Sequence, residues 1–205
     1  MHTNTDTHLD PTASDTTHAS ERIRVWDPLI RLFHWSLVAG FATAFIVEDD
    51  NLSLHVWAGY LVLALISGRL VWGVIGTRQA RFSDFVRRPR AVWAYLGAVI
   101  QRRAPRYLGH NPAGGAMIVL LLISLIATTI SGLALYGAEE LAGPLAEVMR
   151  SFPAIWGDAL EDIHELFANL TLGLILIHVA GVLVSSLLHR ENLIGAMLHG
   201  YKRKE

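Results

Sequence analysis

The chain alternates between long apolar runs and shorter polar segments. Four runs hold at most one charged residue each, over residues 29–47, 54–75, 116–136 and 163–188. At about 1.5 Å of rise per residue, a helix over each run can cross a hydrocarbon layer about 30 Å thick. The pattern predicts an all-α integral membrane four-helix bundle over residues 22–203. Residues 1–21 are polar and predict a disordered tail.

Polar residues and prolines mark where these helices are expected to begin. Asp27 precedes Pro28, a combination typical of a helix cap followed by the first helical position. Ser53 is the predicted cap of the second span. A breaker that runs from Asn111 to Gly115 separates the third apolar run from the polar segment before it.

Charge is sorted by loop, although the net charge is only −1. Residues 77–110 contain eight arginines, and the segment after the fourth span adds Arg190, Lys202, Arg203 and Lys204. The loops after the first and third spans are acidic. The positive-inside rule then places both termini and the arginine-rich segment in the cytoplasm, which predicts a multi-pass protein of a bacterial inner membrane. Anionic lipid head groups, not nucleic acid, are the expected counter-charge of these arginines.

Four histidines fall within the spans: His34 in the first, His55 in the second, and His164 and His178 in the fourth. The last two are fourteen residues apart. In a helix this spacing corresponds to about 21 Å of rise and falls about 40° short of four full turns. His164 and His178 therefore lie on one face of one helix, at two depths in the membrane.

Depth also predicts their partners. His55 and His164 lie near the outer ends of their spans, whereas His34 and His178 lie in the inner half. Each pair can fill both axial positions of a haem iron, which leaves no open position and favours electron transfer over catalysis. Histidines that only hydrogen-bond between helices, or that bind zinc, are the alternatives. The absence of cysteine excludes covalent attachment of the c type.

Other polar residues are candidates for the inner end of the bundle. Arg69 follows His55 by fourteen residues, so it faces the inner haem level, where it can bind a propionate or extend to the membrane edge. His110 and Asn111 form a candidate quinone site, because a histidine that titrates near neutral pH can exchange protons with a quinone. They can equally be a solvated loop. His189 shares the ligand face but lies too far along the helix to remain in the hydrocarbon.

Short motifs around these residues recur in a known family. They are Val25-Trp26-Asp27-Pro28, Arg31-Leu32-Phe33-His34-Trp35, His55-Val56-Trp57-Ala58-Gly59-Tyr60, Gly68-Arg69, Gly109-His110-Asn111-Pro112, the pair His164 and His178, and Arg190-Glu191-Asn192-Leu193 with Ala196-Met197 and Gly200. With them, residues 22–203 resemble the bacterial cytochrome b561 and nickel–iron hydrogenase cytochrome b superfamily. The resemblance implies a four-helix bundle that holds two haems b between histidine pairs and exchanges electrons with quinone.

The expected function is electron transfer between membrane quinone and a periplasmic partner, either a cytochrome or a dehydrogenase subunit. The acidic outer loops suit a basic docking surface on that partner. One alternative is a superoxide:quinone oxidoreductase, although an acidic outer face repels the superoxide anion. Another is a non-redox membrane protein that handles metals. A homodimer is also compatible with the sequence.

Overall fold

Four long helices dominate the computed structural model, which describes residues 22–48, 50–153 and 156–204. Each is long and apolar enough to cross a membrane: α1 (Pro28–Ile46), α2 (Leu52–Ile75), α5 (Pro112–Glu139) and α7 (Trp156–His189). Each helix covers its predicted run to within one residue, so the protein is an all-α, multi-pass membrane bundle. The predicted tail at residues 1–21 lies outside the described residues.

Side-chain caps set the starts of α1 and α2. The carboxylate of Asp27 accepts a hydrogen bond from a first-turn amide at 2.9 Å, as predicted, and Pro28 follows it. The prediction for α2 is wrong by two residues. Asn51, not Ser53, has the extended backbone of a cap, and its side chain accepts from a first-turn amide at 3.0 Å. Ser53 already lies inside the first turn.

Two spans are longer than their apolar runs. α5 begins at Pro112, where Asn111 Oδ1 accepts from the Gly114 amide at 2.7 Å. α7 begins at Trp156, seven residues before the predicted start, and its first turns carry acidic side chains such as Asp158. Polar or small residues can form the end of a helix, but they lower the local hydropathy. The apolar run therefore underestimates the length of these helices.

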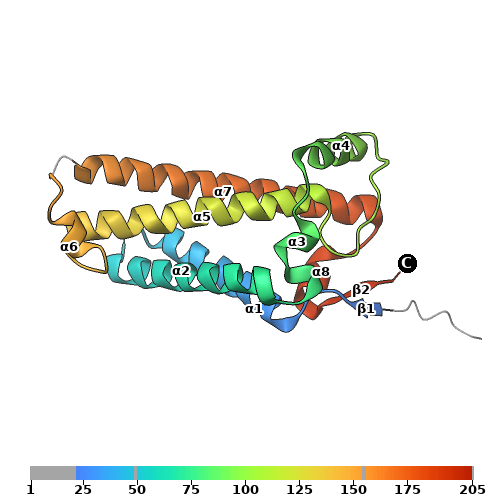
Figure 1. The fold of residues 1–205 in the computed structure, drawn as a ribbon, viewed down its shortest axis with the longest axis horizontal. Helices are drawn as coiled ribbons and strands as arrows, with labels where there is room; N and C mark the ends of the chain where they lie inside the picture. Colours follow the sequence, from blue (N-terminus) through green and yellow to red (C-terminus); the bar gives the residue numbers. More distant parts are fainter. Residues whose placement is uncertain (1–21, 49, 154–155, 205) are drawn as a thin grey trace, which may run out of the picture.

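The four spans form two helix pairs (Figure 1). α5 packs along α7, and α1 packs along α2. α2 and α5 join the two pairs through a buried cluster made of Val62, Ile66, Leu122 and Leu125. α1 and α7 also face each other across the space between the two helix pairs, where His34 of α1 lies opposite His178 of α7.

Shorter elements gather at the arginine-rich end of the bundle (Figure 1). They are η1 (Arg78–Ala80), α3 (Phe82–Phe85), α4 (Pro89–Ile100), α8 (Leu193–His199) and the antiparallel strands β1 (Arg22–Arg24) and β2 (Tyr201–Arg203). In α4, Tyr95 is buried, whereas Trp93 and Ile100 are largely exposed. The opposite end carries the single-turn α6 (Ala146–Met149). One end of the molecule therefore carries several short elements and is basic, whereas the other carries only α6 among the described short elements and is acidic.

A buried ion cluster ties this basic end together. Glu191, just after α7, accepts from Arg106 at 2.9 Å and forms an ion pair with Lys202 of β2 at 3.1 Å. The Lys202 ammonium also donates to the carbonyls of Tyr107 and Leu108, at 3.2 and 3.1 Å. Burial alone would raise the pKa of Glu191, but the hydrogen bonds from Arg106 and Lys202 lower it below its usual value. The cluster links the loop before α5, the end of α7 and β2.

Candidate functional site

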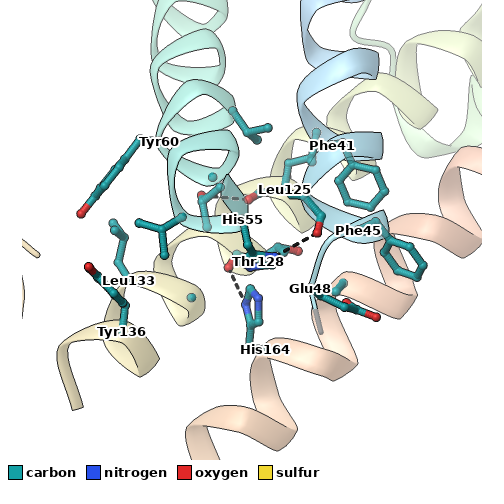
Figure 2. Close-up of a pocket in the computed structure, with 17 residues that line it drawn as sticks. Phe41, Phe45, Glu48, His55, Tyr60, Leu125, Thr128, Leu133, Tyr136 and His164 are labelled. Carbon is teal, nitrogen blue, oxygen red and sulfur yellow. Dashed lines mark hydrogen bonds between the residues drawn. The ribbon is translucent and has the colours of Figure 1, made fainter. Parts of the chain in front are cut away.

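The first candidate site, the outer pair, consists of His55 on α2 and His164 on α7. Their imidazole centroids are 6.0 Å apart and the ring planes are inclined by 80°. The two rings meet between the helix pairs (Figure 2), at the end of the bundle that carries the acidic loops. The structure thus brings together the two histidines that share the outer depth in the sequence.

Hydrogen bonds to carbonyls identify the nitrogen of each outer ring that carries the proton. His55 Nδ1 donates to the carbonyl of Ala44 at 2.9 Å, and His164 Nδ1 donates to the carbonyl of Thr128 at 3.0 Å. A proton held on Nδ1 leaves the lone pair on Nε2, which is the state that binds a metal. Backbone carbonyls of neighbouring helices therefore hold both outer histidines in the protonation state that suits metal binding.

The outer pair lines a cavity that opens between α1, α2, α5 and α7 (Figure 2). Its wall combines small residues, which are Ala44, Gly59, Gly132 and Ala168, with the aromatic residues Phe41, Phe45, Tyr60 and Tyr136. Exposed Glu48 lies at its edge. The small residues leave space for a flat group beside the imidazoles, and the aromatic residues give that space an apolar lining.

The second candidate site, the inner pair, consists of His34 on α1 and His178 on α7. Their ring centroids are 6.5 Å apart and the planes are inclined by 52°. Unlike the outer rings, His34 Nδ1 is buried and has no hydrogen-bond partner among the described residues. The inner pair lies toward the arginine-rich end, so the two pairs are stacked along α7.

The separations within both pairs fit ligands of a shared metal. Two imidazoles bound to opposite faces of one metal, with metal–nitrogen bonds of about 2 Å, have centroids roughly 6 Å apart. Both pairs agree with this value. The alternative is that the histidines serve only to hydrogen-bond to each other. In the outer pair, Nδ1 of His55 and Nδ1 of His164 each bind a backbone carbonyl instead.

A buried hydroxyl cluster separates the two sites. Thr171 stands seven residues from both His164 and His178 and is fully buried. Its hydroxyl oxygen is 2.7 Å from that of Ser124 and 3.1 Å from that of Thr128 on α5. These contacts fix α7 against α5 midway between the pairs, and Thr128 also supplies the carbonyl that binds His164.

Arg69 turns into the basic end of the bundle. Its Nη2 donates to the Ala80 carbonyl at 3.0 Å, and its guanidinium lies over the rings of Phe82 and Phe85, at 5.0 and 5.9 Å. Its Nη1 is buried without a hydrogen-bond partner among the described residues. Arg69 therefore keeps one buried donor that a carboxylate could satisfy.

His110 lies in an aromatic setting near the inner pair. Its ring centroid is 4.6 Å from that of Trp26 and 4.9 Å from that of Phe85. Burial, followed by the nearby positive charges of Arg69 and Lys202, lowers the pKa of His110 to about 3. His110 is therefore uncharged at neutral pH instead of titrating there.

The other two residues singled out in the sequence have clear positions. Asn111 caps α5, as described above, so its carbonyl oxygen accepts a hydrogen bond, while its side-chain NH2 group makes none with the described residues. His189 ends α7, and its Nε2 is buried without a partner among the described residues. Neither of them belongs to a histidine pair.

Sequence reasoning missed the groups that contact the outer histidines. Two are backbone carbonyls, of Ala44 and Thr128, and the others are Ser131 and Gly132 on α5. Every residue has a carbonyl, so the sequence carries no signal for the two that matter. Gly132 lies in an apolar helix in which a glycine suggests only close packing.

A membrane bundle with imidazole pairs stacked at two depths is the architecture of a b-type cytochrome. Comparison with known proteins agrees. Residues 25–200 match the family described as prokaryotic cytochrome b561, and the chain belongs to that family. The protein is thus a membrane cytochrome b, which carries haem b and transfers electrons.

Two similar curated proteins are each named as a probable Ni/Fe-hydrogenase B-type cytochrome subunit. The protein of Cupriavidus necator is 24% identical over 210 residues, which cover 87% of this chain and 86% of the relative. That of Azotobacter chroococcum is 24% identical over 227 residues, covering 92% and 94%. No solved structure gives a significant match.

Proposed function

We propose that this protein carries electrons across the bacterial inner membrane through two haems b, between membrane quinone and a periplasmic redox partner. The observation that carries the proposal is the geometry of the two imidazole pairs, which are stacked along α7 with centroids 6.0 and 6.5 Å apart. A haem iron held by one such histidine pair would have no open position for a substrate, because the haem ring supplies its other four ligands. Such sites serve electron transfer.

The residues around each pair fit a haem. When bound, the haem supplies an iron that accepts and releases one electron. His55 and His164 would hold the outer group through Nε2, with Gly59 leaving space for a flat ring. At the inner pair, the unpartnered Nη1 of Arg69 is a donor suited to a propionate carboxylate.

The arginine-rich end is assigned to the cytoplasm. Arginines at this end are exposed along the segment between α2 and α5, among them Arg87, Arg88, Arg102 and Arg103. The opposite end exposes carboxylates, and its one described arginine, Arg150, pairs with Glu147 at 3.2 Å. By the positive-inside rule, the outer pair then lies on the periplasmic side and the inner pair on the cytoplasmic side.

Quinone exchange is placed at the cytoplasmic edge, beside the inner pair. His110 is uncharged at neutral pH, and its Nδ1 is buried without a partner among the described residues. It would therefore bind a quinone oxygen by a hydrogen bond, and the amide group of Asn111 offers a second donor close by. Arg69 contributes positive charge to the same region.

The periplasmic partner is expected to be positively charged where it docks. The outer end exposes eight described carboxylates: Glu48, Asp50, Glu139, Glu140, Glu147, Asp158, Glu161 and Asp162. Complementary charge speeds association and orients the partner, and the effect weakens with salt. A small cytochrome or a dehydrogenase subunit fits this description. The names of the relatives add a hydrogenase catalytic subunit to the candidates.

A spectrum and a haem assay on the purified protein test the proposal. The reduced-minus-oxidised spectrum should be that of a low-spin b-type cytochrome. The pyridine haemochrome assay should give two haems per polypeptide, all extractable with acid acetone because the chain has no cysteine. One haem or none would contradict the use of both pairs, and the absence of any haem would favour a metal-handling protein.

A further inference from the structure

The two rings of the outer pair are held almost perpendicular to each other. Their planes are inclined by 80°, against 52° in the inner pair. Each outer ring is fixed at Nδ1 by a carbonyl of another helix, that of Ala44 for His55 and that of Thr128 for His164. A ring that is anchored both at its side-chain stem and at Nδ1 has little freedom to rotate.

α5 contributes no histidine but forms the wall behind the ring of His164. The buried hydroxyl of Ser131 lies 3.2 Å from His164 Nδ1 and also donates to the Thr128 carbonyl at 3.0 Å. Gly132 follows, and a Cβ added there would lie 2.8 Å from Cε1 and 3.1 Å from Nδ1 of the ring. The ring therefore fits only because residue 132 has no side chain.

We infer that Ser131 and Gly132 are positioning residues that hold the imidazole of His164 nearly perpendicular to that of His55. Ser131 acts through hydrogen bonding at Nδ1, and Gly132 acts by leaving the space that the ring occupies. The inference rests on the proposed function, because it concerns the orientation of a haem ligand. It assigns α5 a specific part in the outer site.

Ring orientation has a spectroscopic signature. The planes of two axial imidazoles determine how far apart the iron d orbitals that they overlap are split. Near-perpendicular planes leave these orbitals close in energy, and the low-spin ferric EPR signal is then strongly anisotropic. Ligand orientation is one of the means by which a protein tunes a haem. The outer haem should therefore give the more anisotropic of two low-spin signals.

The experiment compares EPR spectra of the oxidised full-length protein in detergent. The test variants are Gly132→Ala, which places a methyl group against the His164 ring, and Ser131→Ala, which removes the hydroxyl without adding volume. The matched control is Gly137→Ala, on the same helix. There a Cβ would meet the Leu145 backbone at 3.0 Å and Met149 at 3.1 Å, a similar crowding that touches neither histidine pair.

Gly132→Ala should lose the strongly anisotropic signal, replaced by a less anisotropic or a high-spin one, while the inner signal remains. Ser131→Ala should shift the same signal by less, with the haem retained. Gly137→Ala should keep both signals. An unchanged outer signal in Gly132→Ala, or the same loss in Gly137→Ala, would overturn the inference.

The experiment also distinguishes a variant that fails to fold, a failure of the proposed function and a failure of the inference. If Gly132→Ala does not accumulate in membranes, the Ser131→Ala spectrum decides, and an unchanged outer signal overturns the inference. The inner signal reports that each variant has folded. If the unmodified protein binds no haem, the proposed function itself fails. If it binds two haems and the α5 variants behave like the unmodified protein, only the role of α5 is wrong.

Discussion

The outer and inner histidine pairs differ in the hydrogen bonding of Nδ1. In the outer pair, Nδ1 of His55 and of His164 donates to a carbonyl, so Nε2 is free to bind iron. In the inner pair, Nδ1 of His34 is buried without a partner among the described residues. The hydrogen bond at Nδ1 affects both ring orientation and ligand basicity. The two sites are therefore expected to respond differently to the loss of a ligand.

Removing one histidine should remove the haem of its own pair. His55→Ala or His164→Ala should lose or convert the outer haem, and His34→Ala or His178→Ala should lose or convert the inner one. Haem content is expected to fall from two per chain toward one, because a bis-histidine site that has lost one ligand holds its haem weakly. The pyridine haemochrome assay, combined with EPR, identifies which haem remains.

The control for these substitutions is His189→Ala, which should keep both haems. His189 lies on the same helix but beyond the inner pair, at the end of α7. Loss of the same signal from His55→Ala and His178→Ala, with the other signal intact in both, would contradict the pairing by depth.

A second residue prediction concerns His110. His110→Ala should slow the reduction of the haems by quinol about tenfold, the effect of losing one hydrogen bond of about 1.4 kcal/mol. Both haems should remain, because His110 belongs to neither pair. Since the pKa of His110 is lowered to about 3, the variant should not remove any step near pH 7 from the pH dependence of the rate.

Stopped-flow mixing of membranes with a soluble quinol measures this rate. Asn111→Ala is unsuitable as the control, because the side chain caps α5. His199→Ala is better, since it lies at the same end of the molecule on α8. Unchanged kinetics in His110→Ala would remove this residue from the mechanism and direct attention to the outer edge near Trp156.

Fixed helix geometry explains which site residues were predictable. The rise per residue gives the depth of every histidine in a span, so the sequence identified which histidines share a level. The rotation per residue placed His164 and His178 on one face. Contacts of Ser131 and Gly132 depend on how α5 is rotated against α7, and that rotation is set by packing. The near-neutral titration expected for His110 was wrong, because the aromatic residues around it come from distant segments.

At the level of elements, α7 is the helix that takes part in both candidate sites. It supplies one histidine to each pair, and Thr171 between them binds α5 through hydroxyl contacts. One continuous helix of 34 residues therefore fixes the vertical separation of the sites. The pair formed by α1 and α2 supplies the second histidine of each site, from α2 for the outer pair and from α1 for the inner pair.

The elements at the basic end depend on the buried ion cluster, which gives a stability prediction. Glu191→Gln should weaken the attachment of β2 and the loop before α5 by about 3–5 kcal/mol, because Lys202 is left buried without its counter-charge. Limited proteolysis of the purified protein, monitored at the Arg102–Arg106 segment, measures the loss. A double variant, Glu191→Met with Lys202→Met, should recover much of it.

The same cluster should respond to acid. The pKa of Glu191 is lowered in the folded protein, so its contribution to stability is present above the unfolded value of about 4.5 and is lost as the pH falls below it. Protease sensitivity at this end should therefore rise with acidification below that value. A pH-independent cleavage rate, or equal cleavage of the Gln variant and the unmodified protein, would show that Glu191 does not hold these elements.

The element boundaries were harder to predict than the elements themselves. The length of an apolar run indicates a span because the hydrocarbon layer has a fixed thickness. Helices that continue beyond their apolar run, as α7 does before residue 163, are no longer limited by that thickness. Ser53 and Asn51 are both good capping residues, and the choice between them depends on the backbone of the short loop after α1.

At the level of the whole molecule, charge divides the two ends. The basic end carries the strands and all the described short helices except α6, and the acidic end carries α6 and the outer pair. Fusions of reporter proteins test the orientation that we infer from this division. A reporter after Lys204, or within residues 81–106, should be active only if it functions in the cytoplasm. A reporter near Glu140 should be active only in the periplasm.

The positive-inside rule explains this expectation, because loops rich in lysine and arginine are retained in the cytoplasm. Fusions in the unmodified chain should be compared with fusions in a variant that lacks Arg87, Arg88 and Arg90, in which the retention should weaken. Activity in the opposite compartments would reverse the orientation and exchange the positions of the outer and inner pairs.

The pairing of β1 with β2 has a consequence for the order in which the protein is made. β1 precedes the first span and β2 follows the fourth, so a ribosome produces them at the start and at the end of residues 22–204. β1 therefore cannot pair with β2 until all four spans have been synthesised. Lys202 of β2 reaches Glu191 only then. All four histidines of the two pairs are synthesised before β2, so the sites that we propose for haem are complete in sequence before the basic end can close.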